Sequence, residues 1–463
     1  MYNNHGICFG GFFMRLRAKE MNMLEGGITS KIIQYAIPLA CASILQQLFN
    51  SADLAIIGRF EDSIAMAAVG ANSSLIALLI SLFSGLSLGS NVTIASFIGM
   101  GHKKDINEAI HTTIALSLVS GVILCLTGEI IAPIILRLMS TPASVLKLAV
   151  VYLRILFIAL PFLLIYDFGS SILRAKGDST RPLYVLFLSG IINIILNIIF
   201  VGPFHLSVAG VALGTLFANA FSAGMVILFL LYEDDPYKLH FNKLKIEKKY
   251  LKKIISIGAP AGIQGMVFSF SNVIIQSGIN SFGANAIAGN TAALNFETMS
   301  FYVVNAFGQA ATTFTSQNYS AGLIDRCKKI YRIAMVVGMS STLLFSMVFW
   351  LARYPLMSLF TASPAVMQYG FTRLFYIDNL ELLTGTYEIS GGCLRGMRHS
   401  LEPAILTMIG SCLFRIIWVS TIFKAHHTIM YLLIVYPISW IICGLCVNIA
   451  YFRIRKRLFN ELM

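Results

Sequence analysis

Charged residues are scarce in this chain of 463 residues: Asp, Glu, Lys and Arg together make up 12%, against 57% hydrophobic residues. Soluble globular chains carry about 25% charged residues, so the composition excludes an ordinary soluble domain. A mean hydropathy of +0.77 indicates an integral membrane protein instead. Long apolar runs repeat from Ile32 to Tyr451 without the short alternating segments of an outer-membrane barrel, so the expected class is all-α.

Motifs of soluble and membrane enzymes are missing as well. No GxxxxGKS/T occurs, which excludes a phosphate-binding loop and direct use of ATP, and no HExxH occurs. The eight cysteines are scattered, and the CxxC of Cys443 and Cys446 falls within the last apolar run, so neither disulfides nor a metal site are expected. We therefore predict that the protein is not an enzyme and has no cofactor.

The net charge of +13 does not point to nucleic acid, because the basic residues lie in short loops between apolar runs instead of forming one patch. With twelve spans and a cytosolic amino terminus, most of the 34 Lys and Arg residues fall on the inner side. We expect a monomeric, multi-pass protein of the cell inner (plasma) membrane, with the lipid bilayer as its surroundings and both termini cytosolic. Residues 1–20 lack the apolar core of a signal peptide and read as a tail or an upstream start ahead of Met21 or Met23.

The apolar runs predict twelve transmembrane helices in two six-helix lobes. The expected spans are 32–58, 64–99, 106–136, 145–172, 182–203, 207–232, 254–281, 285–317, 329–354, 370–394, 402–424 and 428–452. The predicted domains are a cytosolic tail (1–25), an N-lobe (26–232), a basic cytosolic linker (233–253), a C-lobe (254–452) and a cytosolic C-terminal tail (453–463).

The two halves repeat each other. Pro38 corresponds to Pro260, and the segment YDFGSSILRAKGDSTRPL from Tyr166 aligns with YEISGGCLRGMRHSLEPA from Tyr387. Acid, base and proline recur in register, as Asp167 with Glu388, Arg174 with Arg395 and Pro182 with Pro403. An even number of spans in each half gives both copies the same orientation, so we predict a parallel repeat that encloses a site between the lobes.

An acidic residue lies inside the first predicted span. Gln46, Asn50 and Asp53 are four and three residues apart, which places them on one helical face. A carboxylate at membrane depth costs several kcal/mol unless it faces a cavity, a partner or a cation, so Asp53 is a functional candidate. The alternative is that Asp53 only caps the helix or bonds a neighbouring helix. Asn193 and Asn197, one turn apart on span 5, and Thr215 on span 6 could add amide and hydroxyl oxygens.

The runs LQQLFNSADLAIIGRF, LRAKGDSTRPL followed by NIILNIIFV, TSQNYSAG, and LRGMRHSLEP with CLFRIIW resemble the multidrug and toxic compound extrusion (MATE) family. The resemblance extends from about Met23 to Arg457 and implies cation-coupled export of organic compounds by two rocking bundles. It also implies an amino-lobe cation site, H⁺ or Na⁺, at Asp53, Asn193, Asn197 and Thr215. Some relatives carry an acid at the position of Asn197, so this chain has a single carboxylate there.

The second half departs from one branch of the family. Span 7 carries Gln264, Asn272, Gln276 and Asn280 along one face but no acid, so a sodium site of that pattern is not expected here. Arg415 is the basic residue expected deep inside a span, and Glu388 or Glu297 is its expected partner. Asp378 and Glu381 are either functional or merely solvated near the outer end. We name Gln46, Asn50, Asn272, Gln276, Glu297, Glu388 and Arg415 as candidate substrate or cavity residues.

Three functions remain open at this stage. The favoured one is a secondary antiporter that exports organic, drug-like and cationic compounds in exchange for protons or sodium, with a lean toward protons because one acid remains. The second is a flippase for lipid-linked oligosaccharides, which has a similar two-lobe plan and would favour several cavity arginines. The third, a membrane-embedded enzyme, predicts catalytic pairs and no internal duplication.

Overall fold

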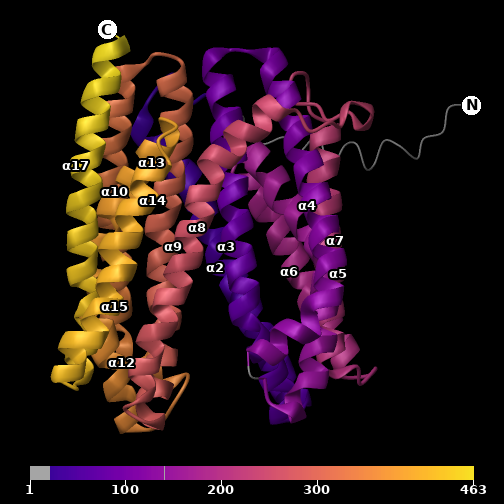
Figure 1. Ribbon diagram of the computed structural model, residues 1–463, viewed down its shortest axis with the longest axis vertical. Coiled ribbons are helices and arrows are strands. Elements are labelled where there is room, and N and C mark those ends of the chain that lie inside the picture. The colour runs from indigo at the N-terminus through magenta and orange to yellow at the C-terminus, as the bar shows by residue number, and fades with distance from the viewer. Residues whose placement is uncertain (1–20, 140, 463) are drawn as a thin grey trace, which may run out of the picture.

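The computed structural model describes residues 21–139 and 141–462, and it builds this part of the chain from helices (Figure 1). The prediction for residues 1–20 lies outside the described residues. The first six long helices are α2 (Ile28–Phe60), α3 (Ser63–Met100), α4 (Lys103–Leu138), α5 (Ala143–Lys176), α6 (Thr180–Val201) and α7 (Ser207–Leu231). The second set begins with α8 (Lys248–Asn280), α9 (Ala284–Ser320), α10 (Ile324–Leu351), α11 (Arg353–Ser358), α12 (Pro364–Tyr376) and α13 (Gly385–Gly396). It ends with α14 (Leu401–Thr407), α15 (Phe414–Trp418), α16 (Ile429–Leu433) and α17 (Val435–Leu462).

Ten helical stretches of the described chain are long and apolar enough to cross a membrane. The prediction of an all-α membrane protein is thus confirmed. Helix α9 and the α12–α13 stretch, which the sequence predicts as spans eight and ten, complete the set. Helix α8 begins at Lys248, so the end of the predicted linker is helical, and α17 continues through the predicted C-terminal tail.

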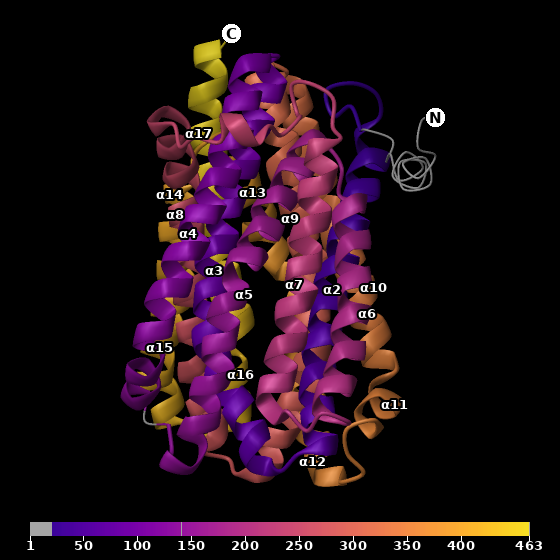
Figure 2. The ribbon, with the colours of Figure 1, turned by 90° about the vertical axis from the view of Figure 1, so that its right-hand side faces the viewer.

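The helices form two bundles that stand side by side (Figure 1). We call α2–α7 the N-lobe and α8–α17 the C-lobe. The end that carries residues 232–247 also carries the C terminus, and we call it the linker end. Figure 2 shows the helices running along the long axis, with α2 beside α6 and α7.

Helix α2 contacts the C-lobe with its first part and the N-lobe with its second part. Its first part, including Ile32, Tyr35 and Leu39, is buried in an apolar cluster with C-lobe residues, and Tyr35 stacks edge-on against Phe314 of α9. Pro38 follows inside the helix, where a proline removes one backbone hydrogen bond. Beyond it, α2 packs along α6 of the N-lobe. Asp53 lies in this second part, near the end of the molecule opposite the linker.

The lobes meet most closely where α3 runs along α8. A Cβ atom at Gly85 or Gly89 would collide with the backbone of α8 around Gly258 and Gly262. Both pairs have GxxxG spacing, which lets the backbones of two membrane helices approach each other. Polar contacts extend this interface toward the linker end, where Thr313 donates to Asn91 Oδ1 at 2.9 Å.

The C-lobe helices are interrupted where those of the N-lobe are continuous. The tenth predicted span is not one α-helix, because a 3₁₀ segment (Asp378–Thr384) separates α12 from α13. The eleventh contains two π-helical segments, Met408–Leu413 and Val419–Phe423. Irregular turns inside long helices are frequent at functional sites, and the 3₁₀ segment carries two acidic residues.

Candidate functional site

Asp53 lies at the contact between α2 and α6, where the predicted amino-lobe residues come together. Asn197 Nδ2 donates a hydrogen bond to Asp53 Oδ1 at 2.7 Å. Asn197 and Asn193 are buried in α6, whereas the Asp53 side chain is only half-buried. The carboxylate therefore has amide donors on one side and remains accessible on the other.

Asn193 completes the contact when its amide is assigned by its hydrogen-bond partners. In that orientation its nitrogen donates to Asp53 Oδ1 at 2.8 Å, and its oxygen accepts from the backbone N–H of Thr215 at 3.2 Å. The Thr215 hydroxyl donates to the Val211 carbonyl at 3.0 Å. Three helices, α2, α6 and α7, thus supply the four residues of this cluster, which we call the Asp53 cluster.

Two glycines make room for the Asp53 cluster. A Cβ atom at Gly214 of α7 would strike Asn197 Oδ1, and a Cβ atom at Gly190 of α6 would strike the ring of Phe49. Asn197 Oδ1 is a buried oxygen with no hydrogen-bond partner among the described residues. The amide is held in place by packing against Gly214 on one side and by Asp53 on the other.

Gln46 and Asn50 occupy the same face of α2 as Asp53, as their spacing predicts. Both side chains are exposed, and Gln46 Nε2 donates to Asn50 Oδ1 at 3.3 Å. Asn50 lies one turn and Gln46 two turns from Asp53, toward the middle of α2. A polar strip on this helix therefore leads to the carboxylate.

The C-lobe buries its charges in a different way. Arg373 of α12 donates to both oxygens of Glu297 on α9, at 2.7 Å from Nε and 2.9 Å from Nη2. Its Nη1 donates to Asn290 Oδ1 at 2.5 Å, and the guanidinium is 3% exposed. This bidentate arrangement fixes the position of Glu297. The side chain of Asn290 in turn donates to Gln276 of α8 at 3.2 Å.

The predicted partner of Arg415 is wrong. Glu297 pairs with Arg373, and within the described chain no carboxylate forms an ion pair with Arg415. Arg415 donates to Ser439 at 3.1 Å and to Asn272 at 3.4 Å, and its guanidinium lies 4.3 Å from the ring centroid of Tyr436. Arg373 was not predicted, because it stands near the start of an expected span, where a basic residue is typical of a surface anchor.

Asp378 and Glu381 are buried, at 0% and 3% exposure, so the solvated interpretation is excluded. Neither oxygen of Asp378 has a hydrogen-bond partner among the described residues, and Glu381 Oε2 has none either. Glu381 is in electrostatic range of Glu297, Asp378, Arg373 and Arg415. Glu388 lies further along, on α13, with Arg395 as its charged neighbour. Four carboxylates and three guanidiniums of the described chain thus share the interior of the C-lobe.

In the N-lobe the acid faces the neutral amides of Asn193 and Asn197 and, within the described chain, forms no ion pair. In the C-lobe Glu297 is paired with Arg373, whereas Asp378 and Glu381 are buried nearby and form no ion pair among the described residues. The 3₁₀ break was not foreseen from the sequence. Two acids three residues apart in an apolar run, Asp378 and Glu381, are also typical of the solvated end of a helix, so the sequence alone does not distinguish the two.

Comparisons with known proteins identify the family and the fold. Residues 38–199 and 260–420 match the MatE family model, and the two matched segments begin at the prolines that the internal repeat aligns. "Probable multidrug resistance protein YoeA" of Bacillus subtilis is 27% identical over 382 residues, which cover 81% of this chain and 82% of that protein. "Probable multidrug resistance protein NorM" of Thermotoga maritima is 24% identical over 436 residues, covering 93% and 92%.

A solved structure of an outward-facing multidrug resistance MATE family transporter of the MOP superfamily has the same fold. It superposes with a TM-score of 0.84 at 21% identity, covering 95% of this chain and 99% of that one. The resemblance predicted from the sequence is confirmed. Since the two segments matched by the family model span more than half of the chain, the protein belongs to the MatE family of multi-pass membrane transporters and is not an enzyme.

Proposed function

We propose that the protein exports organic cations in exchange for protons, and that the Asp53 cluster is its coupling site. The observation that carries this proposal is the contact of Asp53 with Asn197 at 2.7 Å and with Asn193 at 2.8 Å, away from any ion pair in the described chain. Both curated relatives named above carry multidrug resistance in their names, which supports drug-like cargo.

The choice of protons rests on which atoms face the carboxylate. Asn193 and Asn197 both present amide nitrogens to Asp53, and a nitrogen that donates a hydrogen bond cannot ligate sodium. A sodium ion needs several oxygen ligands, as other hard cations do, and Asp53 is the one acid of the cluster. A proton needs only the carboxylate itself.

The choice of cationic cargo follows from the same charge. An ionised Asp53 attracts a cation, and a protonated Asp53 does not. Cargo and proton therefore oppose each other at one group. A ligand can shift a transporter between states only by binding them differently, and this opposition supplies the difference. The polar strip of Gln46 and Asn50 offers the cargo a path to the carboxylate.

The flippase alternative gains no support from the C-lobe arginines. Arg373 is occupied by Glu297 through two hydrogen bonds. Arg415 is 2% exposed and packs on aromatic rings, so neither guanidinium is offered to a pyrophosphate.

Transport in reconstituted vesicles tests the proposal. The wild-type protein should extrude a cationic dye under a pH gradient, and Asp53→Asn should lower the rate at least about tenfold, since Asn cannot exchange a proton. Asp62→Asn is the matched control, because it makes the same chemical change at the N-cap of α3, where Asp62 accepts from Ala65 at 2.9 Å.

Each arm of this assay has a decisive result. Export driven by a sodium gradient at constant pH would overturn proton coupling. Equal export of an anionic dye would overturn the cationic cargo. Full export by Asp53→Asn would remove the Asp53 cluster from the mechanism, and an equal loss in Asp62→Asn would show that the effect is not specific to the site.

A further inference from the structure

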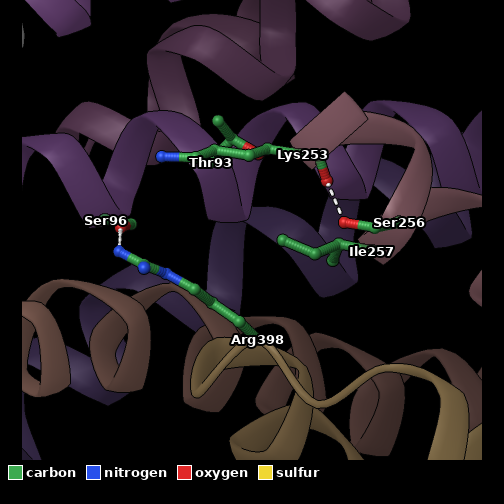
Figure 3. A pocket seen from close by; sticks show the side chains of 6 residues that line it. All are labelled: Thr93, Ser96, Lys253, Ser256, Ile257 and Arg398. Carbon is green, nitrogen blue, oxygen red and sulfur yellow. Dashed lines mark hydrogen bonds between the residues drawn. The ribbon is translucent and has the colours of Figure 1, made fainter. Parts of the chain in front are cut away.

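A small hollow lies between the lobes at the linker end, far from the Asp53 cluster (Figure 3). Its volume is about 60 Å³, and its lining residues come from α3, from α8 and from the loop between α13 and α14. They are Thr93, Ser96, Lys253, Ser256, Ile257 and Arg398. Two cations and three hydroxyls around one hollow are the chemistry that recognises a phosphate group.

Both cations reach from the C-lobe to helix α3 of the N-lobe. Arg398 Nη2 donates to the hydroxyl of Ser96, and Figure 3 shows the side chain extended toward it. Lys253 Nζ lies 4.5 Å from the ring centroid of Phe97, the next residue of α3. Within the described part of the chain, neither cation forms an ion pair with a carboxylate. Their positive charges are therefore available to a ligand.

The backbone at Arg398 is unusual for its residue type. Its φ angle is +68°, a left-handed conformation that costs a side chain such as arginine about 1 kcal/mol or more. The repeat-related position is Gly177, with a φ angle of +104°, which glycine adopts freely. The C-lobe thus places an arginine where the N-lobe uses the residue suited to the turn, and strain of this kind is retained mostly at functional positions.

The N-lobe counterpart of Lys253 shows what such a lysine binds. By the offset that aligns Pro38 with Pro260, Lys253 corresponds to Lys31. Lys31 Nζ donates to the carbonyl of Asn22 at 2.6 Å and to that of Glu25 at 2.7 Å. The peptide preceding α2 thus folds back to supply oxygens to its lysine.

The peptide that precedes α8 takes another course. The carbonyls of Pro236 and Lys238 accept from Asn107 of α4 at 3.0 and 3.3 Å. The carbonyl of Lys245 accepts from Thr112 at 3.2 Å. This segment is held against the N-lobe, so its carbonyls do not serve Lys253. An external oxygen ligand can take that role.

The surroundings of the hollow favour a lipid over a free ion. Ile255 is 43% exposed, and Leu401 and Ile405 are 56% and 41% exposed, so apolar side chains flank both cations. The linker end is the side predicted to face the cytosol, where anionic lipid headgroups attract basic residues. A phosphate bound here would have its acyl chains beside these side chains.

We propose that this hollow binds the headgroup phosphate of an anionic phospholipid, with Lys253 and Arg398 as its cations and Ser96 as a hydroxyl ligand. The lipid would contact both lobes at once. It would therefore stabilise the arrangement in which α3 and α8 are in contact, because it binds that state and not one with the linker end apart.

Native mass spectrometry of the full chain in detergent measures this binding. The first phosphatidylglycerol molecule should bind the wild type about tenfold more tightly than the first phosphatidylcholine, because both carry a phosphate but the choline cation of the second is repelled by Lys253 and Arg398. The double variant Lys253→Gln with Arg398→Gln should lose that preference. Lys252→Gln with Lys329→Gln is the matched control, because it removes the same charge from two exposed lysines outside the hollow and should keep the preference.

The proposal would be overturned if the wild type bound the two lipids equally or if the pocket variant kept its preference for phosphatidylglycerol. It would also be overturned if the control variant lost that preference to the same extent. Added inorganic phosphate separates the two sources of phosphate. If millimolar phosphate displaced the phosphatidylglycerol, the hollow would be a site for the free ion and not for a lipid. Unchanged phosphatidylcholine binding by the pocket variant confirms that it is folded.

Discussion

The two lobes bury acidic residues against opposite kinds of partner. In the N-lobe, Asp53 faces the amides of Asn193 and Asn197. In the C-lobe, Glu297 accepts two hydrogen bonds from Arg373, which is 3% exposed. A neutral partner leaves a carboxylate able to exchange a cation, whereas an arginine holds it ionised. This difference supports the proposed coupling role of the N-lobe, and we infer a structural role for the Arg373–Glu297 pair.

The Arg373–Glu297 pair connects α12 to α9 next to the 3₁₀ segment that interrupts the tenth span. Arg373 lies near the end of α12, just before the 3₁₀ segment, and Glu297 lies on α9. Through Asn290 and Gln276 the same network reaches α8. We infer that this network fixes the position of α12 where the regular helix ends.

Removing one partner of the Arg373–Glu297 pair should give the largest loss of stability. Arg373→Met leaves Glu297 buried without its partner, which costs about 3–5 kcal/mol in comparable buried pairs. Adding Glu297→Gln to Arg373→Met should recover much of that loss, because the unpaired charge is then gone. The free energy of unfolding in mixed detergent micelles measures both variants.

Asp53→Asn provides the contrast within the same measurement. It should change the free energy of unfolding by less than about 1 kcal/mol, because an amide can still bond to Asn193 or Asn197. A small effect of Arg373→Met together with a large effect of Asp53→Asn would reverse the assignment of roles to the two lobes.

A second variant probes the packing that holds the Asp53 cluster. A Cβ atom at Gly214 would strike Asn197 Oδ1, so Gly214→Ala should cost about 1–3 kcal/mol and slow ion-driven export as well. Gly224→Ala is the matched control on the same helix. No atom lies within 4 Å of a Cβ there, so it should be neutral or slightly stabilising. Equal effects of the two substitutions would show that helix propensity, and not contact with Asn197, decides the outcome.

The sequence predicted the Asp53 cluster better than it predicted the C-lobe. The spacing of Gln46, Asn50 and Asp53 placed them on one face, and the resemblance added Asn193, Asn197 and Thr215, which the structure brings together around the carboxylate. Regular helical periodicity made this possible, because α2, α6 and α7 are continuous near the site. The internal repeat was also readable, since its polar residues recur in register.

The C-lobe was harder to predict because its helices are irregular. The 3₁₀ segment at Asp378–Thr384 has fewer residues per turn than an α-helix, so the side chains before and after it do not keep the register of one continuous helix. Arg373 and Glu297 are 76 residues apart, and nothing local links them. The close contact of α3 and α8 was predictable from the sequence, because both helices contain a GxxxG spacing.

The loops at the linker end also differ between the lobes in how their charged residues are paired. In the N-lobe, Glu233 balances two cations, with Lys176 Nζ at 2.5 Å from Oε2 and Arg181 Nη2 at 2.5 Å from Oε1. The repeat-related loop of the C-lobe carries His399 and Glu402, which lie 2.7 Å apart. Within the described chain, Arg398 of this loop forms no ion pair and is a cation of the proposed lipid site. Glu233 thus ties the linker to the N-lobe, and the C-lobe loop lacks an equivalent tie within the described chain.

Losing the contacts of Glu233 should cost less than losing the Arg373–Glu297 pair. Burial raises the pKa of Glu233, but Arg181 and Lys176 outweigh it and hold the pKa below its ordinary value. Its stabilisation is therefore complete above the ordinary glutamate pKa of about 4.3 and is lost as the pH falls through the lower folded value. Glu233→Gln should cost about 1–2 kcal/mol at pH 7, measured by thermal unfolding, and wild type and variant should converge as the pH falls from the ordinary pKa through the lowered one. Glu247 is half-buried but its ion-pair partner Lys245 is 74% exposed, so Glu247→Gln should change stability by less than about 0.5 kcal/mol. A gap between wild type and Glu233→Gln that stayed constant down to pH 3 would mean that the carboxylate charge is not what holds the linker.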